Sequence, residues 1–521
     1  MKKITLLLFI FFGFSYSQNL TVESGGTLTI EKTGAVTVSG NFTNNGTATL
    51  RSDSNEFSSL IVQGTSSGNI TYNRYVNSLS GGTGWDLIGS PVNGLQISSF
   101  VSTNDAGSSP LATGNGSGAG DVGEYAIGTY DPSNNSWSNY TSSNVSTTQF
   151  TPGKGYQMAT DSGATLAFTG TVDTDATETI SIESFTDASG SRWNLISNPY
   201  PSFITLGPNS TTNTFLEVND DIIDATYVGV YGYDADNSNG SNYTIYNNTS
   251  SSKIAPGQAF FVAARSTNAA NITFKEEMQT TSTGDDFISG DIMENTEVEL
   301  RIYNNGNAVG NTKLFFDEGL TLGLNPGWDA GSFSQSDPIM TRLVEEDEGH
   351  GMAINAMGLD DMENAVIPLV INQTAGQEFR INLHTATIPD PNVYLEDVEE
   401  GTFTNLYEGD FVYTPTSDLS GAGRFFIHMT ADTMSNEEVS ISMLNAYKEI
   451  DASYITIEGL ATQSNETKVS LYNILGREVL STTLNNNMGT QTISTVGLSA
   501  GIYVIELESG SDRLTKKLIV H

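Results

Sequence analysis

The chain has 521 residues, with 21 Lys and Arg against 60 Asp and Glu, and its formal net charge is −39. A chain this acidic has few of the basic residues that neutralise phosphates, which argues against nucleic acid and anionic lipid surfaces as partners. The 52 Gly and the low share of charged residues (16%) favour strands and turns over helices. Because the chain has no Cys, disulfides and thiolate chemistry are excluded.

The first 17 residues have the pattern of a secretory signal peptide. Lys2 and Lys3 precede an apolar run over 4–14, and the segment Ser-Tyr-Ser at 15–17 then places small residues at the −3 and −1 positions of a cleavage site. We expect cleavage between Ser17 and Gln18. The apolar run is shorter than the ~20 residues that span a bilayer, and no later run reaches that length, so we expect a secreted chain without a transmembrane segment.

Residues 18–80 carry short apolar triplets that begin at Leu20, Leu28 and Val36 and are separated by Gly. Triplets at a constant spacing predict a β-solenoid-like segment, and a meander that caps the next domain is the alternative. Three short rungs bury little surface by themselves, so this segment is expected to pack against its neighbour.

Two copies of one domain follow. The segment WDLIGSP at 85–91 reappears as WNLISNP at 193–199, and Tyr-Asp and Pro-Gly landmarks recur in the same order at an offset of about 105 residues. We assign β-sandwich repeats to 81–183 and 184–283. Residues 284–440, with alternating strands such as 298–302 and 379–383, predict a further β-sandwich. The fold class is therefore all-β and multidomain.

The C-terminal residues 443–521 carry three motifs in order. Gly476 and Arg477 follow a strand that ends in Tyr-Asn-Ile-Leu, Gly501 and Tyr503 lie in a Leu-Ser-Ala-Gly-Ile-Tyr segment, and a Lys pair precedes a terminal apolar run. This region resembles the type IX secretion C-terminal sorting domain of Bacteroidetes, in its type A form, and predicts a small Ig-like sandwich. The resemblance implies that Gly476, Arg477, Gly501, Tyr503, Lys516 and Lys517 form the sorting motif.

The same resemblance implies export across the outer membrane, with the type IX secretion machinery as partner. In that family a sortase-like peptidase commonly removes the domain, and the cargo is then released or attached to surface lipopolysaccharide. The region before the sorting domain resembles uncharacterised all-β surface proteins of the same bacterial group. We therefore expect an extracellular or outer cell-surface location.

The residue inventory offers little catalytic chemistry, and we nominate no catalytic residue. The four His residues include no His-Glu-x-x-His zinc motif. The segment at 64–68 matches Gly-x-Ser-x-Gly, but the predicted strand after it does not fit the strand–turn–helix context that a nucleophile elbow requires. A carboxylate pair for glycoside hydrolysis stays open, because its separation is a property of the fold.

Two further groups of residues are candidates for binding. Asp234 and Asp236 place oxygen ligands at alternating positions of a turn, which suits calcium as the one cofactor considered, and a solvated hairpin tip is the alternative reading. Candidate contacts to a glycan or matrix ligand are Trp137, Tyr140, Tyr243 and Tyr246. We predict a non-catalytic binding or adhesion protein. A structural spacer without a specific ligand, or a glycan-active hydrolase, are the alternatives.

Overall fold

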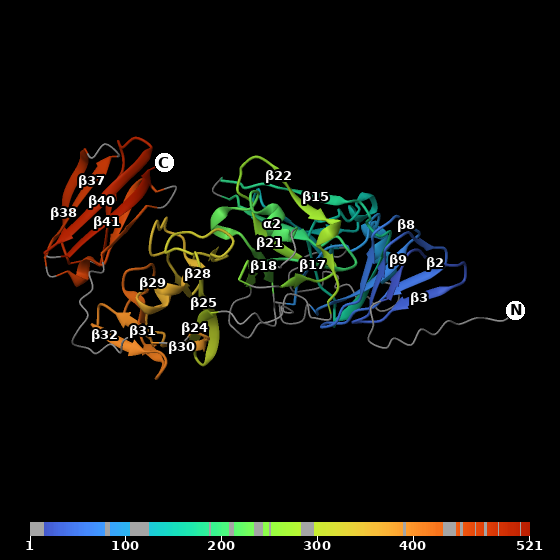
Figure 1. Cartoon of the computed structure of the whole chain (residues 1–521), viewed down its shortest axis with the longest axis horizontal. Helices are drawn as coiled ribbons and strands as arrows, with labels where there is room; N and C mark the ends of the chain where they lie inside the picture. The colour runs from blue at the N-terminus through green and yellow to red at the C-terminus, as the bar shows by residue number, and fades with distance from the viewer. Residues whose placement is uncertain are drawn as a thin grey trace. The chain divides into compact units, whose positions relative to one another are not determined.

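A computed structural model represents the protein. It describes residues 15–78, 84–104, 124–186, 189–207, 213–233, 243–249, 252–282, 296–388, 392–430, 444–448, 452–463, 465–473, 477–487, 489–510 and 512–520. The chain divides into two compact units, residues 1–236 with 242–293 and residues 237–241 with 294–521, and each is described by itself. The fold is all-β, as predicted (Figure 1).

The first unit begins with a parallel β-solenoid. Its strands form three sheets, and in each sheet the neighbouring strands from residue 15 to residue 76 pair in parallel. The first coil contains β1 (Ser15–Ser17), β2 (Leu20–Val22) and β3 (Thr27–Ile30), the second β4 (Ala35–Val38), β5 (Phe42–Asn44) and β6 (Thr47–Leu50), and the third β7 (Ser59–Val62), β8 (Ser66–Ser67) and β9 (Ile70–Val76).

The eight-residue spacing of the sequence corresponds to one side of a coil and not to a whole rung. Leu20 of β2 pairs with Phe42 of β5, so a full coil takes about three such triplets. An Asn ladder holds one corner: the Asn19 side-chain oxygen accepts the Asn41 backbone N–H at 2.8 Å, and the Asn41 side-chain oxygen accepts the Thr65 backbone N–H at 3.0 Å. β1 includes Ser17, and cleavage before Gln18 stays a prediction.

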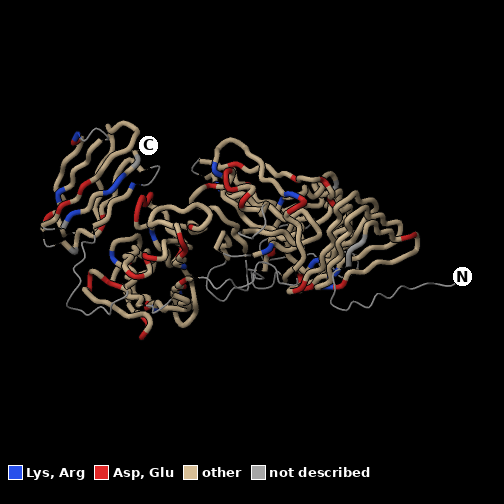
Figure 2. Tube along the Cα trace, in the orientation of Figure 1, with Lys and Arg blue, Asp and Glu red and all other residues tan. Residues whose placement is uncertain are grey.

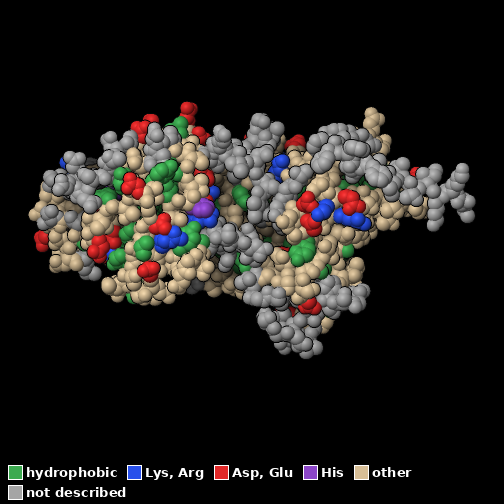
Figure 3. All heavy atoms as spheres, turned by 90° about the horizontal axis from the view of Figure 1, so that it is seen from below, with side chains coloured by type: hydrophobic (Ala, Val, Ile, Leu, Met, Phe, Trp, Pro, Cys, Tyr) green, Lys and Arg blue, Asp and Glu red, His purple; other side chains and the backbone are tan. Residues whose placement is uncertain are grey.

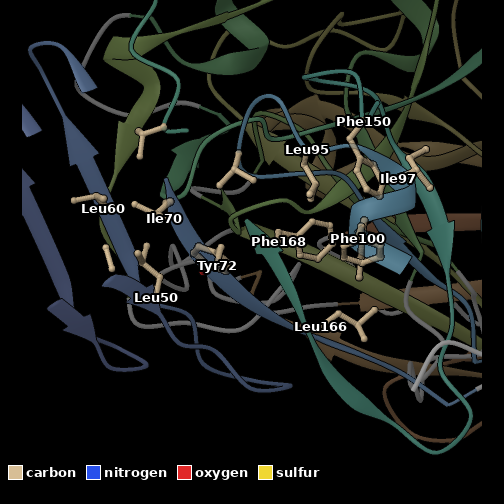
Figure 4. Packing of buried hydrophobic residues seen from close by; sticks show 14 of the residues in the cluster. Leu50, Leu60, Ile70, Tyr72, Leu95, Ile97, Phe100, Phe150, Leu166 and Phe168 are labelled. Carbon is tan, nitrogen blue, oxygen red and sulfur yellow. The ribbon is translucent and has the colours of Figure 1, made fainter. Parts of the chain in front are cut away.

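The first repeat shares its core with the solenoid. Buried side chains of the third coil, such as Leu60 and Tyr72, belong to the same cluster as Phe100, Phe150 and Phe168 of the repeat (Figure 4). β14 pairs with β9 over its whole length, which joins the two parts into one sheet. The repeat contains β10 (Asp86–Ile88), α1 (Ile97–Asn104), β11 (Glu124–Asp131), β12 (Ser136–Thr141), a 3₁₀ turn (Val145–Thr147), β13 (Tyr156–Met158) and β14 (Ala164–Gly170).

The second repeat has a core of its own, in which Tyr200, Phe215 and Phe260 are buried. It contains β15 (Thr177–Ile182), β16 (Trp193–Ser197), β17 (Phe203–Thr205), α2 (Phe215–Asn219), a 3₁₀ turn (Ala225–Tyr227), β18 (Val230–Tyr233), β19 (Tyr243–Tyr246), β20 (Lys253–Ile254), β21 (Ala259–Ala263), β22 (Ala270–Lys275), a 3₁₀ turn (Glu276–Met278) and β23 (Gln279–Thr280). β15 lies in the range assigned to the first repeat, yet it pairs with β22 of the second. It therefore corresponds to β9, which pairs with β14.

Each repeat ends its helix on a buried Asn that ties the helix to a strand. The side-chain amide of Asn219 donates to the carbonyls of Phe215 (2.8 Å) and Thr273 (3.0 Å), and its oxygen accepts the Thr273 N–H at 2.8 Å. Asn104 makes the same three hydrogen bonds to the carbonyls of Phe100 (2.9 Å) and Ala167 (3.2 Å) and to the Ala167 N–H (2.8 Å). These hydrogen bonds satisfy a backbone carbonyl of the helix and the backbone carbonyl and N–H group of one residue in the strand.

The second unit begins with one large, mainly antiparallel sheet, here called the sheet domain (296–430). A core with Leu300, Phe316 and Ile381 lies against it. Its strands are β24 (Thr296–Asn304), β25 (Asn307–Asp317), β26 (Ala330–Gly331), β27 (Ile339–Thr341), β28 (Met352–Gly358), β29 (Val366–Ile371), β30 (Phe379–Ala386), β31 (Asn392–Asp397), β32 (Thr402–Asn405), β33 (Phe411–Tyr413) and β34 (Phe425–Thr430), with a 3₁₀ turn at Leu359–Glu363.

The C-terminal domain is a sandwich of a three-stranded and a four-stranded antiparallel sheet around one core. Basic residues lie beside acidic ones along its strands (Figure 2), as in the pair Arg513 and Glu506. Its elements are β35 (Asn445–Tyr447), β36 (Tyr454–Glu458), a 3₁₀ turn (Leu460–Thr462), β37 (Thr467–Asn473), β38 (Glu478–Leu484), β39 (Thr490–Ser494), β40 (Gly501–Ser509) and β41 (Asp512–Val520). Among the described residues, no helix has the length and apolar character needed to cross a membrane.

Candidate functional site

The two repeats of the first unit contact each other through corresponding residues. The Gly89 N–H donates to the Gly257 carbonyl at 2.7 Å, and the Ser197 N–H donates to the Gly153 carbonyl at 2.8 Å. Gly89 corresponds to Ser197 and Gly153 to Gly257 in the sequence repeat, so each repeat gives the other the same hydrogen bond. Reciprocal hydrogen bonds of this kind are the pattern that two-fold symmetric dimers have across their interface.

Gly89 and Ser197 meet each other where the two repeats are closest. A Cβ atom on Gly89 would lie 1.9 Å from the Ser197 hydroxyl oxygen, which itself donates to the Lys154 carbonyl at 2.9 Å. The second repeat can have Ser at position 197 only because the first repeat has Gly at the corresponding position 89. This close contact fixes how the hairpins of the two repeats approach each other.

An aromatic cluster forms beside this junction, and we call Tyr130, Trp137, Tyr243 and Phe261 the aromatic platform. Phe261 of β21 lies between hairpins of both repeats: its ring centroid is 5.1 Å from Tyr130, 6.2 Å from Trp137 and 6.1 Å from Tyr243. Tyr130 and Trp137 are cross-strand partners with centroids 5.3 Å apart. Tyr233 and Tyr243 form the corresponding pair in the second repeat, at 5.6 Å.

Exposure differs sharply within the platform. Phe261 is buried, with 2% of its surface exposed, whereas Trp137 on the edge strand β12 is 40% exposed. Burial raises the pKa of the Tyr130 and Tyr243 hydroxyls above the usual value for tyrosine, so both are neutral at physiological pH. The platform therefore presents an indole ring that buried or half-buried rings hold in place from below.

Polar side chains lie on the hairpin that carries the exposed indole and on the neighbouring strand β13. The Tyr130 hydroxyl donates to the Asn135 side-chain oxygen at 2.7 Å, and the Gln157 amide donates to the Asn139 side-chain oxygen at 2.7 Å. Asp131 tightens the hairpin tip, because it accepts from the backbone N–H and the hydroxyl of Ser133 at 2.9 and 2.7 Å. An aromatic ring with amide and hydroxyl groups around it can stack on a sugar ring and hydrogen-bond its hydroxyls.

The four residues expected to contact a ligand separate into two pairs. Trp137 and Tyr243 belong to the platform, whereas Tyr140 and Tyr246 pack against the cores of the first and second repeats. Residues three apart on a strand point to opposite faces, so each hairpin contributes one residue to the platform and one to its core. Burial also raises the pKa of Tyr140 to about 12.

The calcium prediction concerns residues that lie outside the described ranges. Asp234 and Asp236 both belong to 234–242, between β18 and β19. Within the part of the chain that the structure describes, no group of three or more Asp, Glu or His side chains is arranged to hold a metal ion. The site at Asp234 and Asp236 stays a prediction.

One histidine forms a close pair with a carboxylate in the sheet domain. The His428 Nε2 atom lies 2.6 Å from the Glu396 carboxylate, and the side chains are 1% and 8% exposed. Phe403 lies against the imidazole, with centroids 5.3 Å apart. A pair this buried contacts protein and not solvent, so we assign it a structural role in joining β31 to β34.

Surface charge gives no second candidate on the face in view. Figure 3 shows basic side chains beside acidic ones and apolar side chains in small separate groups. Exposed ion pairs such as Arg51–Glu31 (3.0 Å) and Lys32–Glu56 (2.5 Å) in the solenoid are of this kind. Exposed pairs of this type contribute little to stability or to recognition.

The described residues of the expected sorting motif lie on adjoining elements of the C-terminal sandwich. Tyr503 is buried on β40, and its hydroxyl donates to the Ser499 carbonyl at 2.7 Å. Lys516 and Lys517 lie on β41, which pairs with β40, and Gly501 begins β40. Arg477 is exposed directly before the hairpin strand β38, and Gly476 lies outside the described residues.

Comparison with protein families gives two matches. Residues 13–429 match the family model described as "Domain of unknown function (DUF8693)". The chain belongs to this family. Residues 451–521 match the model described as "Secretion system C-terminal sorting domain", which confirms the resemblance found in the sequence. The protein is therefore a type IX secretion cargo that is exported to the extracellular space or the outer cell surface.

The family model spans the solenoid, both repeats and the sheet domain as one region, in agreement with the core that the solenoid shares with the first repeat. A search of curated proteins found no match. Among solved structures, a chain titled "Biofilm associated protein - BSP domain" has 10% identity and a TM-score of 0.18, over 87% of this chain and 96% of that chain. A TM-score this low supports no statement on fold or function.

Sequence reasoning missed three parts of the site. Phe261 has no distinguishing sequence signal in its apolar strand, and its contacts with the first repeat depend on how the repeats pair. Gly89 and Ser197 occupy corresponding places in the repeat, and a Gly aligned with a Ser directly after a matching Ile was the available signal. The paired Asn104 and Asn219 lie in segments that align poorly, so their equivalence becomes visible only through their hydrogen bonds.

Proposed function

We propose that this secreted protein is a non-catalytic surface protein that binds a glycan or a matrix polymer through the aromatic platform. The observation that carries the proposal is the 40% exposed indole of Trp137, supported by Tyr130 and by Phe261 of the other repeat. A ring that is fixed before binding loses little conformational entropy when a ligand stacks on it, so even a shallow surface can bind a sugar.

The location of the platform agrees with this role. It lies at the junction of the two repeats, where two hairpins present aromatic and amide groups together. Contacts with a single sugar ring are weak, and a surface protein gains strength when many copies on one cell meet a repeating polymer. A polymer with repeated sugar units is therefore a better fit for this site than an isolated small molecule.

The test is a binding screen of the secreted chain against glycans and matrix polymers, with and without calcium. Trp137→Ala should weaken binding about tenfold or more, because truncating a central aromatic contact costs at least about 1–2 kcal/mol. Trp137→Phe should keep part of the affinity, since a smaller ring can still stack. Tyr407→Ala, which removes a 63% exposed aromatic of the sheet domain, is the matched control and should leave binding unchanged.

Each outcome of the screen has a definite meaning. Binding that requires calcium and is lost in Asp234→Ala would move the site to the predicted calcium loop. No binding to any member of the panel would refute the proposal and favour a structural spacer. Release of cleaved sugars would refute the non-catalytic part and favour a glycan-active hydrolase.

A further inference from the structure

Within the second unit, the sorting domain contacts the sheet domain through buried charged groups. The Arg342 guanidinium of the sheet domain lies 4.1 Å above the ring of Tyr447, which belongs to β35 of the sorting domain. Asp347 pairs with the same guanidinium at 2.9 Å from within the sheet domain. The Tyr447 hydroxyl in turn donates to the Glu458 carboxylate at 3.0 Å. Arg342, Asp347, Tyr447 and Glu458 are all buried, with 2–6% of their surface exposed.

Burial of these groups depends on both domains. An arginine or a carboxylate is strongly hydrated in water, and it is buried only where other charges or hydrogen bonds compensate for the lost water. Arg342 has its carboxylate partner, Asp347, in its own domain, and the aromatic face that covers it comes from the sorting domain. The sorting domain therefore completes the burial of the Arg342–Asp347 pair with an aromatic face.

The backbone of the sheet domain at Gly423 also lies close to the Glu458 side chain of the sorting domain at this interface. A Cβ atom on Gly423, in the turn before β34, would lie 2.9 Å from the Cβ of Glu458. The same turn contains Gly421, where an added Cβ would meet nothing within 4 Å. Both glycines have positive φ, at 106° and 80°. Only the first is therefore required by the contact with the sorting domain.

The terminal strand β41 adds two lysines to the same contact. The Lys516 ammonium donates to the Asn445 side-chain oxygen at 2.9 Å, and it lies near Glu458 and Asp347. Lys517 forms an ion pair with Glu346 of the sheet domain. Both lysines belong to the predicted sorting motif, so the strand that carries the motif also takes part in the contact with the cargo.

We propose that the sorting domain stays bound to the sheet domain after the chain between them is cut. The interface that holds it contains Arg342, Tyr447, Glu458 and the close approach at Gly423. Proteolysis at the junction separates the two domains covalently and leaves these contacts intact. Release of the sorting domain then requires a second event that opens the interface, such as engagement of the β41 lysines by an acidic surface.

The test uses the full chain with a recognition sequence for a specific protease inserted between residues 431 and 443. After complete cleavage, size-exclusion chromatography at micromolar concentration should show the sorting domain eluting with the rest of the chain. Elution of the sorting domain as a separate species from the unmutated interface would overturn the proposal.

A matched pair of variants tests the interface itself. Gly423→Ala should release the sorting domain, with at least a tenfold larger free fraction after cleavage, because the new methyl group collides with Glu458. Gly421→Ala also places a methyl group at a position with positive φ, but in open space, and should leave the complex intact. Equal free fractions in the two variants would refute the assignment of this interface.

A charge exchange provides an independent test if Gly423→Ala fails to fold. Lys517→Glu replaces the ion pair with Glu346 by two carboxylates that repel each other. The free fraction of the sorting domain after cleavage should therefore rise severalfold at low ionic strength. Adding Glu346→Lys restores the opposite charges and should reverse the change. A double variant that releases as much sorting domain as Lys517→Glu alone would contradict the contact between these residues.

Discussion

The buried Asn219 provides the sharpest test of how the second repeat is held together. Asn219→Ala removes three hydrogen bonds, two donated to the carbonyls of Phe215 and Thr273 and one accepted from the Thr273 N–H. Each such bond contributes about 1 kcal/mol, so we expect a loss of about 3 kcal/mol in the free energy of unfolding of this repeat. Asn104→Ala removes the corresponding three bonds in the first repeat and should cost a similar amount.

Amide hydrogen exchange of peptides from β22 measures this effect locally. A loss of about 3 kcal/mol corresponds to exchange that is about 100-fold faster, since each 1.4 kcal/mol is a factor of ten. Asn271→Ala, at an exposed position of the same strand, is the control and should leave the rate within about twofold. A change below about fivefold in Asn219→Ala would refute the view that this side chain joins α2 to β22.

Three further results are expected. Burial raises the pKa of Glu458 to about 7, despite Arg342, Tyr447 and Lys516 nearby, so the protonated form is favoured in the folded state. The folded state is therefore destabilised as pH rises from the usual glutamate range through about 7. Glu458→Gln, which stays neutral, should raise the free energy of unfolding by about 3 kcal/mol at pH 8 and by almost nothing at pH 4. Denaturant unfolding at the two pH values measures this difference. Gly89→Ala should lower the thermal midpoint of the first unit, because its methyl group collides with the Ser197 hydroxyl; an unchanged midpoint would contradict the pairing of the repeats. Tyr503→Phe should destabilise the sorting domain by about 1 kcal/mol through loss of one hydrogen bond, measured by chemical unfolding, with wild-type stability as the contrary result.

The sequence by itself determined the fold class and the sorting domain, and it predicted the tandem repeat. Alternating strands, Gly turns and motifs such as Gly501 with Tyr503 are local patterns, and local patterns reflect which face of a strand is buried. For the same reason the sequence showed the triplets of the solenoid. It did not show how many triplets make up one coil. That number depends on parallel pairing between strands that are far apart in the sequence, such as β2 with β5.

Only the tertiary structure decided which residues form sites. The sequence placed Trp137, Tyr140, Tyr243 and Tyr246 in polar hairpins, and the pairing of the repeats left Trp137 and Tyr243 in the platform with Phe261 while the other two packed against cores. The contact between the sorting domain and the sheet domain was equally invisible in the sequence. Its charges come from segments more than 100 residues apart, and a buried charge is tolerated only where folding brings its partner close enough to replace water.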